Sequence, residues 1–407
     1  MTTGLKTISA PVIPKDVPKK DLPKKDVPKE DIPKQIIERK VPRISAVDIG
    51  RGIAMVLVIL VHTTWSLVKD PSGNLSRSDI PIVWLSQLAT PAFLLISGMM
   101  LGYLFYSSDK SRFQRLELKL IKRALILLTF IHIFMNSGWA IYNSKPIMIL
   151  TVFGITDVIG ITLLIYLYFI KRISIKLYPA VIAFIAAWFF ARSWFPDGYT
   201  MMIIKQLFLG PSADQPLHLH SSFALIPLTC IFHIGVVFGK KLSVAVMRGQ
   251  LNNVKRMFLK AGIMMIIAAI LLHQAGKFLF PKLILLGKDW ENALYLFQKY
   301  PPSISYVLFY GGFSILLINF LLWYGKKFNG YGLWGRIFRV FGRTSLFTFA
   351  IQMHITMTIP YLLGFSSSLN RTEWFASFIV SLSIIWFCSF LWMKYYMKIP
   401  FKSPQPD

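Results

Sequence analysis

The sequence predicts an all-α fold, a polytopic membrane bundle of about ten transmembrane helices with a disordered cytoplasmic tail at the amino terminus. Three observations lead to this prediction. Of the 407 residues, 55% are hydrophobic and only 15% are charged, whereas soluble domains carry roughly a quarter charged residues. The apolar residues gather in runs that are each about long enough to cross a hydrocarbon layer of ~30 Å. The basic residues lie mainly between these runs, which is typical of loops at a membrane surface.

The first segment of the chain has a composition that does not support a packed core. Residues 15–34 are four tandem pentads, KDVPK, KDLPK, KDVPK and EDIPK, with proline at every fifth position among charges of both signs. Such a segment has no apolar face to bury and favours a solvated, partly polyproline II tether. Docking to a partner or to lipid headgroups is the alternative. We therefore expect a disordered pentad-repeat tail at 1–43, a transmembrane domain at 44–400 and a short cytoplasmic tail at 401–407.

Ten apolar runs follow the tail. They cover 46–68, 80–106, 118–141, 147–170, 177–195, 217–239, 257–275, 303–324, 338–363 and 373–393. Placing the amino terminus in the cytoplasm assigns most lysines and arginines to the inner side, loop after loop, as the positive-inside rule expects. Both termini are therefore expected in the cytoplasm. Segment 276–302 is expected as an outer loop, with a re-entrant or interfacial segment as the alternative.

Charge and cysteine usage exclude several other classes of protein. A formal net charge of +27 would suggest nucleic acid as the partner of a soluble chain, but here the anionic face of a lipid bilayer is the expected partner. Cys230 and Cys388 both lie inside apolar runs, so we expect no disulfide framework. We see no glycine-rich phosphate loop, nucleophile elbow or zinc-protease helix. We expect no nucleic acid, no metal site and no permanently bound cofactor.

The first apolar run, RISAVDIGRGIAMVLVILVHT, carries three ionisable residues. Asp48 and Arg51 are three positions apart and are expected to pair on one helix face, which lowers the cost of placing them near the membrane boundary. His62 follows Arg51 by about three turns, or ~16 Å along the axis, on nearly the same face. An imidazole there has the chemistry of a general base for acyl transfer. A histidine satisfied by a neighbouring helix is the alternative.

The second run, TPAFLLISGMMLGYLF, contains small residues that allow close helix approach or a local opening of the backbone ladder. Ser97 and Gly98 are candidates for the lining of a polar cavity, and helix packing alone is the alternative. Two further candidates for a polar lining, Asn136 and Asp157, lie at membrane depth in later runs. Asp157 needs a partner or a water-filled cavity, because a carboxylate is costly in the hydrocarbon layer.

A strongly basic stretch, DKSRFQRLELKLIKRALIL, begins the third run. Lys119, Lys122 and Arg123 are three and four positions apart, so they can form one cationic face at the mouth of a helix. Arg115 belongs to the same stretch. A polyanionic phosphate ligand would bind to such a face, and ordinary positive-inside flanking is the alternative.

Arginine, ten residues, then histidine is the pattern of the acyltransferase type three proteins. With Asp48 ahead of the arginine and PAFLLISG after the histidine, the sequence more closely resembles the bacterial relatives of the heparan-alpha-glucosaminide N-acetyltransferase catalytic domain. Segments KYPPSISYVLFYGG at 299–312 and VFGRTSLFTFAIQMH at 340–354 are similar to late segments of that group. One departure is Gln352, where the family usually has a histidine. Another is His62 itself, which matches an asparagine in the eukaryotic enzyme.

The resemblance implies an acyltransferase that takes an acyl group, expected to be acetyl, from cytoplasmic acyl-CoA. The acceptor is expected to be a hydroxyl or amino group of an extracytoplasmic glycan, lipid-linked sugar or secreted small molecule, and the location a bacterial inner membrane. By resemblance, His62 is the catalytic base or a transient acyl carrier, with Arg51 and Asp48 as its support. The residues that would face the CoA phosphates are Arg115, Lys119, Lys122 and Arg123.

Two other functions stay open at this point. In a proton-coupled transporter, histidines and carboxylates within the membrane would relay protons, and the basic segments would only set topology. In a catalytically inactive scaffold, the pentad tail would recruit partners. The sequence leaves a homodimer open as well.

Overall fold

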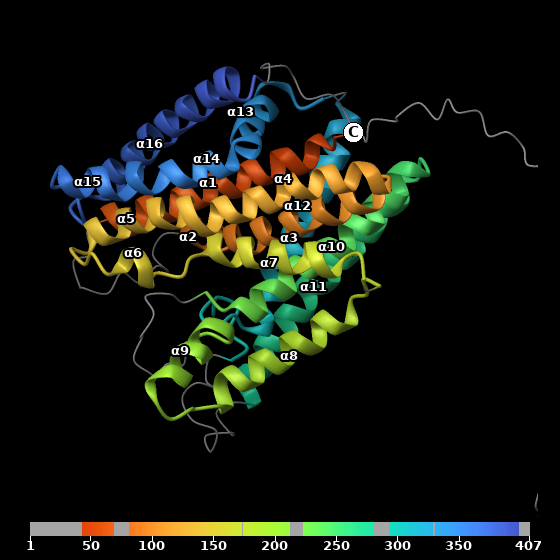
Figure 1. Cartoon of the computed structure of the whole chain (residues 1–407), viewed down its shortest axis with the longest axis horizontal. Helices are drawn as coiled ribbons and strands as arrows, with labels where there is room; N and C mark the ends of the chain where they lie inside the picture. Colours follow the sequence, from red (N-terminus) through yellow and green to blue (C-terminus); the bar gives the residue numbers. More distant parts are fainter. Residues whose placement is uncertain are drawn as a thin grey trace, which may run out of the picture. The chain divides into compact units, whose positions relative to one another are not determined.

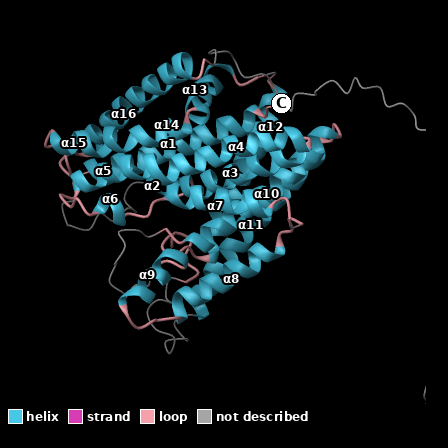
Figure 2. Cartoon of the chain, in the orientation of Figure 1, coloured by secondary structure: helices cyan, strands magenta, loops and turns pink. Residues whose placement is uncertain are grey.

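The computed structural model describes residues 43–68, 81–172, 174–211, 223–279, 293–328 and 330–398. These residues are helical apart from their connecting loops and two isolated backbone bridges, Val68 with Leu369 and Lys299 with Pro302 (Figure 2). The predicted all-α fold is therefore confirmed for this part of the chain. The pentad repeats, the last residues of the chain and residues 280–292 of segment 276–302 lie outside the described residues.

Seven helical rods in the described residues are long and apolar enough to cross a membrane: Ser45–Leu67, Trp84–Ser107, Lys110–Tyr142, Leu225–Met247, Leu251–Leu279, Ile304–Lys327 and Arg371–Tyr396. The protein is thus an integral membrane protein. Two further apolar helices, α7 (Ile155–Phe169) and α8 (Tyr178–Ser193), are shorter.

The three remaining predicted runs are shorter or broken in the structure. Run 147–170 contains α6 (Met148–Thr151) and then α7, because the backbone is extended at Gly154. Run 177–195 corresponds to α8 alone. Run 338–363 falls into four pieces that begin earlier than predicted: α13 (Gly332–Arg343), α14 (Ser345–Met353), the π-helical turn η6 (His354–Thr358) and α15 (Ile359–Leu362).

Helix α1 (Ser45–Leu67) lies inside the bundle. It contacts α3 (Ala89–Ser107), α12 (Ile304–Lys327), α13, α14 and α16 (Arg371–Leu391), and most of its side chains are buried (Figure 1). Between α1 and α3 the chain also forms α2 (Pro81–Ser86). Because neighbours surround α1, its polar residues face protein and not lipid.

Glycines bring α3 against α10 (Leu225–Met247) at backbone distance. A Cβ atom at Gly98 would lie 2.0 Å from the carbonyl oxygen of Phe232, and one at Gly102 would lie 2.2 Å from that of Val236. On α10, Gly235 meets the backbone of α3 just as closely. The prediction that small residues of the second run allow close helix approach is confirmed.

A second close crossing joins α1 to α13. A Cβ atom at Gly52 would lie 1.9 Å from the carbonyl oxygen of Phe338, and one at Gly342 would lie 1.8 Å from that of Asp48. The glycine after Arg51 in the first motif is therefore required by packing. This crossing places Arg343 of α13 beside Asp48, in the amino-terminal part of α1.

The third rod consists of α4 (Lys110–Ile126), the π-helical turn η2 (Leu127–Ile131) and α5 (His132–Tyr142). It begins at Asp109, whose side chain accepts a hydrogen bond from the backbone N–H of Arg112 at 2.7 Å. Helix α7 packs against α4 and η2. π-Helical turns insert an extra residue and often occur at functional sites; η2 ends one residue before His132, and η6 begins at His354.

The remaining helices complete the described part. Helix α9 (Tyr199–Phe208) follows α8, and α8 contacts α10. Helix α11 (Leu251–Leu279) packs along α12, and the π-helical turn η7 (Trp392–Tyr396) extends α16.

Candidate functional site

Asp48 is the centre of a cationic cluster at the amino-terminal end of α1. Its carboxylate accepts hydrogen bonds from Nε and Nη2 of Arg43 at 2.6 and 3.0 Å, and Nε of Arg343 lies 3.6 Å from Oδ2. The side chain of Asp48 is 1% exposed. The expected pairing of Asp48 with Arg51 is thus replaced by a bidentate bond to Arg43, because Arg43 approaches the carboxylate with both donors of its guanidinium fork.

Arg51 lies on α1 three positions after Asp48, near the pair of Asp48 and Arg43. Its Nε atom is buried and has no hydrogen-bond partner among the described residues. The charges of Asp48, Arg123 and Arg43 all act on it, so α4 contributes to the same cluster. On α13, the charge of Arg339 acts on Arg343 in the same way.

We call this group the arginine cluster: Asp48 with Arg43, Arg51, Arg123, Arg339 and Arg343. Its positive charges outnumber its single carboxylate. Guanidinium groups bind phosphate oxygens in a bidentate manner, and a bound anion would balance the excess of positive charge. The cluster therefore has the chemistry of a site for a phosphate-bearing ligand.

The other predicted phosphate-binding residues flank this cluster. Arg115, Lys119 and Lys122 are exposed on α4, on the helix face that also carries Arg123. Of these four residues, Arg123 is thus the one whose charge acts on Arg51. Arg115, Lys119 and Lys122 lie outside the cluster, on the exposed surface of α4.

Three members of the cluster were not singled out by the sequence patterns. Arg339 and Arg343 lie four positions apart in GLWGRIFRVFGR, on one helix face, and this spacing is a signal that can be found in the sequence. Arg43 precedes α1 and has no such periodic signal. It acts through a contact that depends on how the chain enters the helix.

His62 lies near the opposite end of α1. Its Nδ1 atom is 2.8 Å from Oε1 of Gln352 on α14. Because a carbonyl oxygen only accepts, Nδ1–H is the donor, and Nε2 is left as the unprotonated nitrogen of the neutral ring. The charge of Lys299 also acts on His62. The late motif therefore meets the first motif directly, at the very residue where the sequence departs from the family.

Further hydrogen bonds hold this end of α1 in place. Ser66 donates to the carbonyl oxygen of Thr356 at 2.6 Å, which joins α1 to η6. His354 is directed elsewhere, with its Nε2 atom 2.8 Å from the carbonyl oxygen of Phe134 on α5. The imidazole of His354 thus links η6 to α5 and is not the partner of His62.

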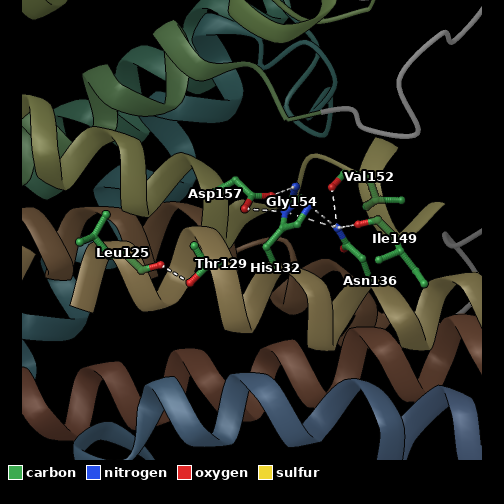
Figure 3. A network of polar contacts seen from close by, with 8 residues as sticks. All are labelled: Leu125, Thr129, His132, Asn136, Ile149, Val152, Gly154 and Asp157. Atoms are coloured by element: carbon green, nitrogen blue, oxygen red, sulfur yellow. Dashed lines mark hydrogen bonds and ion pairs between the residues drawn. The ribbon is translucent and has the colours of Figure 1, made fainter. Parts of the chain in front are cut away.

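A second imidazole and a carboxylate meet between α5 and α7 (Figure 3). Nδ1 of His132 lies 2.9 Å from Oδ1 of Asp157, and the other carboxylate oxygen accepts the backbone N–H of Gly154 at 2.7 Å. Asn136 donates to the carbonyl oxygen of Val152 at 2.8 Å. Asp157 and Asn136 are buried, so the partner that the sequence demanded for Asp157 is His132.

The residues of the second run take different positions. Gly98 is in the contact of α3 with α10 described above, so packing alone explains this glycine. Ser97 is half-buried on the same helix, and no hydrogen bond between described residues joins it to His62. Within the described ranges there is also no group of three or more histidines, cysteines or carboxylates arranged to hold a metal ion.

These features define an integral membrane protein whose central helix carries a cluster of arginines at one end and a hydrogen-bonded histidine near the other. Residues 43–268 match the family model described as Heparan-alpha-glucosaminide N-acetyltransferase, catalytic. Since the match covers more than half of the chain, the protein belongs to this family, and the resemblance seen in the motifs is confirmed. Family membership implies a membrane acetyltransferase that uses acetyl-CoA.

The matched range includes Asp48, Arg51, His62, the basic start of α4, and the network of His132 and Asp157. The segments with α13 and Gln352 lie beyond it. A search among curated proteins gave no match.

Proposed function

We propose that this protein transfers an acetyl group from cytoplasmic acetyl-CoA to a hydroxyl or amino group of an extracytoplasmic glycan, lipid-linked sugar or small molecule. It would do so in a bacterial inner membrane, with ten spans and both termini inside. The observation that carries the proposal is the arrangement along α1, with the arginine cluster at one end and the His62–Gln352 pair at 2.8 Å near the other.

The donor would bind at the arginine cluster. The negatively charged phosphates of acetyl-CoA would neutralise the excess positive charge of Arg51 and its neighbours. Each guanidinium also offers paired donors to phosphate oxygens. Lys119 and Lys122 at the rim would attract the polyanion before it is bound. The half-buried setting of Arg51 strengthens these contacts, because charges interact more strongly away from bulk water.

The acceptor would react beside His62. Since Nδ1–H is held by Gln352, Nε2 is the nitrogen that can take the proton from the acceptor. The acceptor oxygen or nitrogen then attacks the thioester carbonyl carbon, the C–S bond breaks, and the CoA thiolate leaves. Positioning the two substrates together would supply much of the remaining acceleration.

The proposed topology treats α7, α8 and the segment from α14 to α15 as additional spans. Each is apolar but shorter than the seven long rods. A short span is accommodated by local thinning of the bilayer or by packing against neighbouring helices. The positive-inside distribution supports this topology.

Proton-coupled transport is the second candidate. The observation that favours it is the pair of His132 and Asp157 between α5 and α7 (Figure 3), because a histidine and a carboxylate within membrane segments are typical of proton relays. In this case the arginine cluster would bind an anionic cargo.

Acetyl-CoA turnover by the purified protein tests the proposal. Wild type and His62→Ala are incubated with a panel of glycan and amine acceptors, and products are identified by mass spectrometry. We expect a transferred acetyl group for wild type and its loss in His62→Ala. His273→Ala, which removes a half-buried histidine of α11, is the matched control. Absence of both acetyl-CoA binding and product from folded wild type would contradict the proposal.

A further inference from the structure

Gln352 has two polar ends, and only one of them has a partner. Its side chain is 0% exposed. Oε1 accepts the hydrogen bond from His62 at 2.8 Å. Nε2 is buried and has no hydrogen-bond partner among the described residues. A buried N–H without a partner is unfavourable, and such groups in native proteins often have a functional reason.

The backbone around Gln352 is well satisfied, so the unpartnered amide is not part of a loosely ordered segment. The carbonyl oxygen of Gln352 accepts a hydrogen bond from Oγ1 of Thr356 at 2.8 Å. Thr356 in turn accepts the hydrogen bond of Ser66 on α1. The first contact is made within the segment of α14 and η6, and the second joins that segment to α1 one turn beyond the His62–Gln352 pair.

The amide of Gln352 is planar and its two polar atoms are bonded to one carbon, so Nε2 is held close to the imidazole that Oε1 orients. During acyl transfer, negative charge develops on the oxygen of the attacked carbonyl. A fixed, buried N–H donor next to the catalytic base is the arrangement that stabilises such an oxyanion.

We infer that Gln352 is a catalytic residue with two functions: Oε1 positions His62, and Nε2–H donates to the carbonyl oxygen of the acetyl group. This inference rests on the proposed function. The acceptor gives its proton to Nε2 of His62 as its oxygen or nitrogen bonds to the acetyl carbon, and the carbonyl electron pair moves to the oxygen beside Gln352. When that pair returns, the C–S bond breaks, and the thiolate takes the proton from His62.

Two substitutions test the N–H donor, one with and one without an oxygen to orient His62. Gln352→Glu keeps an oxygen for His62 and has no N–H donor, whereas Gln352→Met has a similar length and has neither. Thr356→Val is the matched control, since it removes a buried hydroxyl one turn further along and leaves both ends of Gln352 intact. We expect kcat to fall about 10²- to 10³-fold in Gln352→Glu and Gln352→Met, with little change in the KM for acetyl-CoA.

The decisive experiment observes the acetyl carbonyl bond of bound acetyl-CoA directly. Infrared difference spectra are recorded for acetyl-CoA, isotope-labelled at the acetyl carbonyl carbon, bound to wild type and to each variant. We expect the carbonyl stretch to move to lower frequency in wild type and Thr356→Val, and to lose this shift in Gln352→Met and Gln352→Glu. Nitrogen NMR of histidine-labelled protein is expected to show His62 protonated on Nδ1 in wild type.

Each other outcome overturns the inference in a recognisable way. A carbonyl band that is unshifted in bound wild type, or equally shifted in Gln352→Met, rejects the N–H donor while leaving the proposed function intact. A His62 ring protonated on Nε2 would mean that the amide of Gln352 faces the other way. Failure of wild type to bind acetyl-CoA rejects both the proposed function and this inference.

Discussion

The two ends of α1 are built on different principles. At the amino-terminal end, Arg43 and Arg343 contact the carboxylate of Asp48, and the Nε atom of Arg51 has no partner in the described part of the chain. Near the other end, neutral groups form directed pairs, His62 with Gln352 and Ser66 with Thr356. Excess charge suits the capture of a polyanion, whereas directed hydrogen bonds suit the control of one proton. Under the proposed function, substrate binding and proton transfer are thus divided between the two ends of one helix.

The largest effect is expected from the glycine crossing that brings α13 to the amino-terminal end of α1. Gly52→Val places atoms where the carbonyl oxygen of Phe338 already lies, 1.9 Å from an added Cβ. We expect destabilisation of about 3 kcal/mol or more, as for severe overpacking, measured as a lower melting temperature and a low yield in detergent. The control is Gly311→Ala on α12, where the added Cβ meets only the end of the Met265 side chain at 3.2 Å. Equal stability of the two variants would refute the close crossing.

A charge substitution at Arg51 tests whether the arginine cluster binds acetyl-CoA. Arg51→Gln is expected to weaken acetyl-CoA binding about 10- to 100-fold, since a hydrogen bond to a charged group contributes about 1.5–3 kcal/mol. Binding is measured by isothermal titration on the purified protein. Arg248→Gln, which removes an exposed inner arginine at the end of α10, should bind as wild type does. An equal loss of acetyl-CoA affinity in both variants would show that only the general positive charge of the surface, and not the arginine cluster, contributes to binding.

The network between α5 and α7 gives a smaller, structural prediction. Asp157→Ala removes the acceptor of the Gly154 N–H and the partner of His132, so we expect a loss of about 1–2 kcal/mol, as for a helix cap. Asp157→Asn should lose less, because an amide oxygen can still accept from Gly154. Thermal unfolding of the two variants checks the order. Equal losses in the two variants would show that the charge of Asp157, which both lack, and not the hydrogen bond to Gly154, provides the stability.

The smallest effect is a pH dependence at the start of α4. The backbone N–H of Arg112 and the hydroxyl of Ser111 lower the pKa of Asp109 below its ordinary value of 3.8. A lowered pKa means that the cap is fully formed above 3.8 and is lost as the pH falls through the lower, folded-state value. Asp109→Asn should therefore remove a slight acid-dependent decrease in melting temperature. An unchanged acid profile in this variant would exclude a contribution from Asp109.

The sequence predicted the parts of the site that lie within one helix. Asp48, Arg51 and His62 share α1, and Arg123 shares a face of α4, so helical spacing was sufficient to select them. The all-α fold followed from the apolar runs for the same reason. Local periodicity also explains why Gly98 was selected, although its close contact with α10 reflects packing.

The rest of the site depends on contacts between distant segments. His62 and Gln352 are 290 positions apart, and no local pattern predicts which residue of α14 meets α1. The pairing of Asp48 with Arg43 instead of Arg51 depends on the approach of the chain to the helix. Likewise, hydropathy predicted one span over 338–363 because α13 and α14 are both apolar in part, whereas the structure breaks the run at Thr344.

The central claim is that donor and acceptor are handled at opposite ends of α1, and sidedness tests it most directly. Purified protein is reconstituted in vesicles, the orientation is determined by protease accessibility, and acetyl-CoA is supplied only on the side of the arginine cluster. Acceptors from the panel are supplied only on the other side. We predict acetylated product on the acceptor side for wild type and none for His62→Ala. Product that forms only when both substrates share one side, or that forms equally in His62→Ala, would contradict the account.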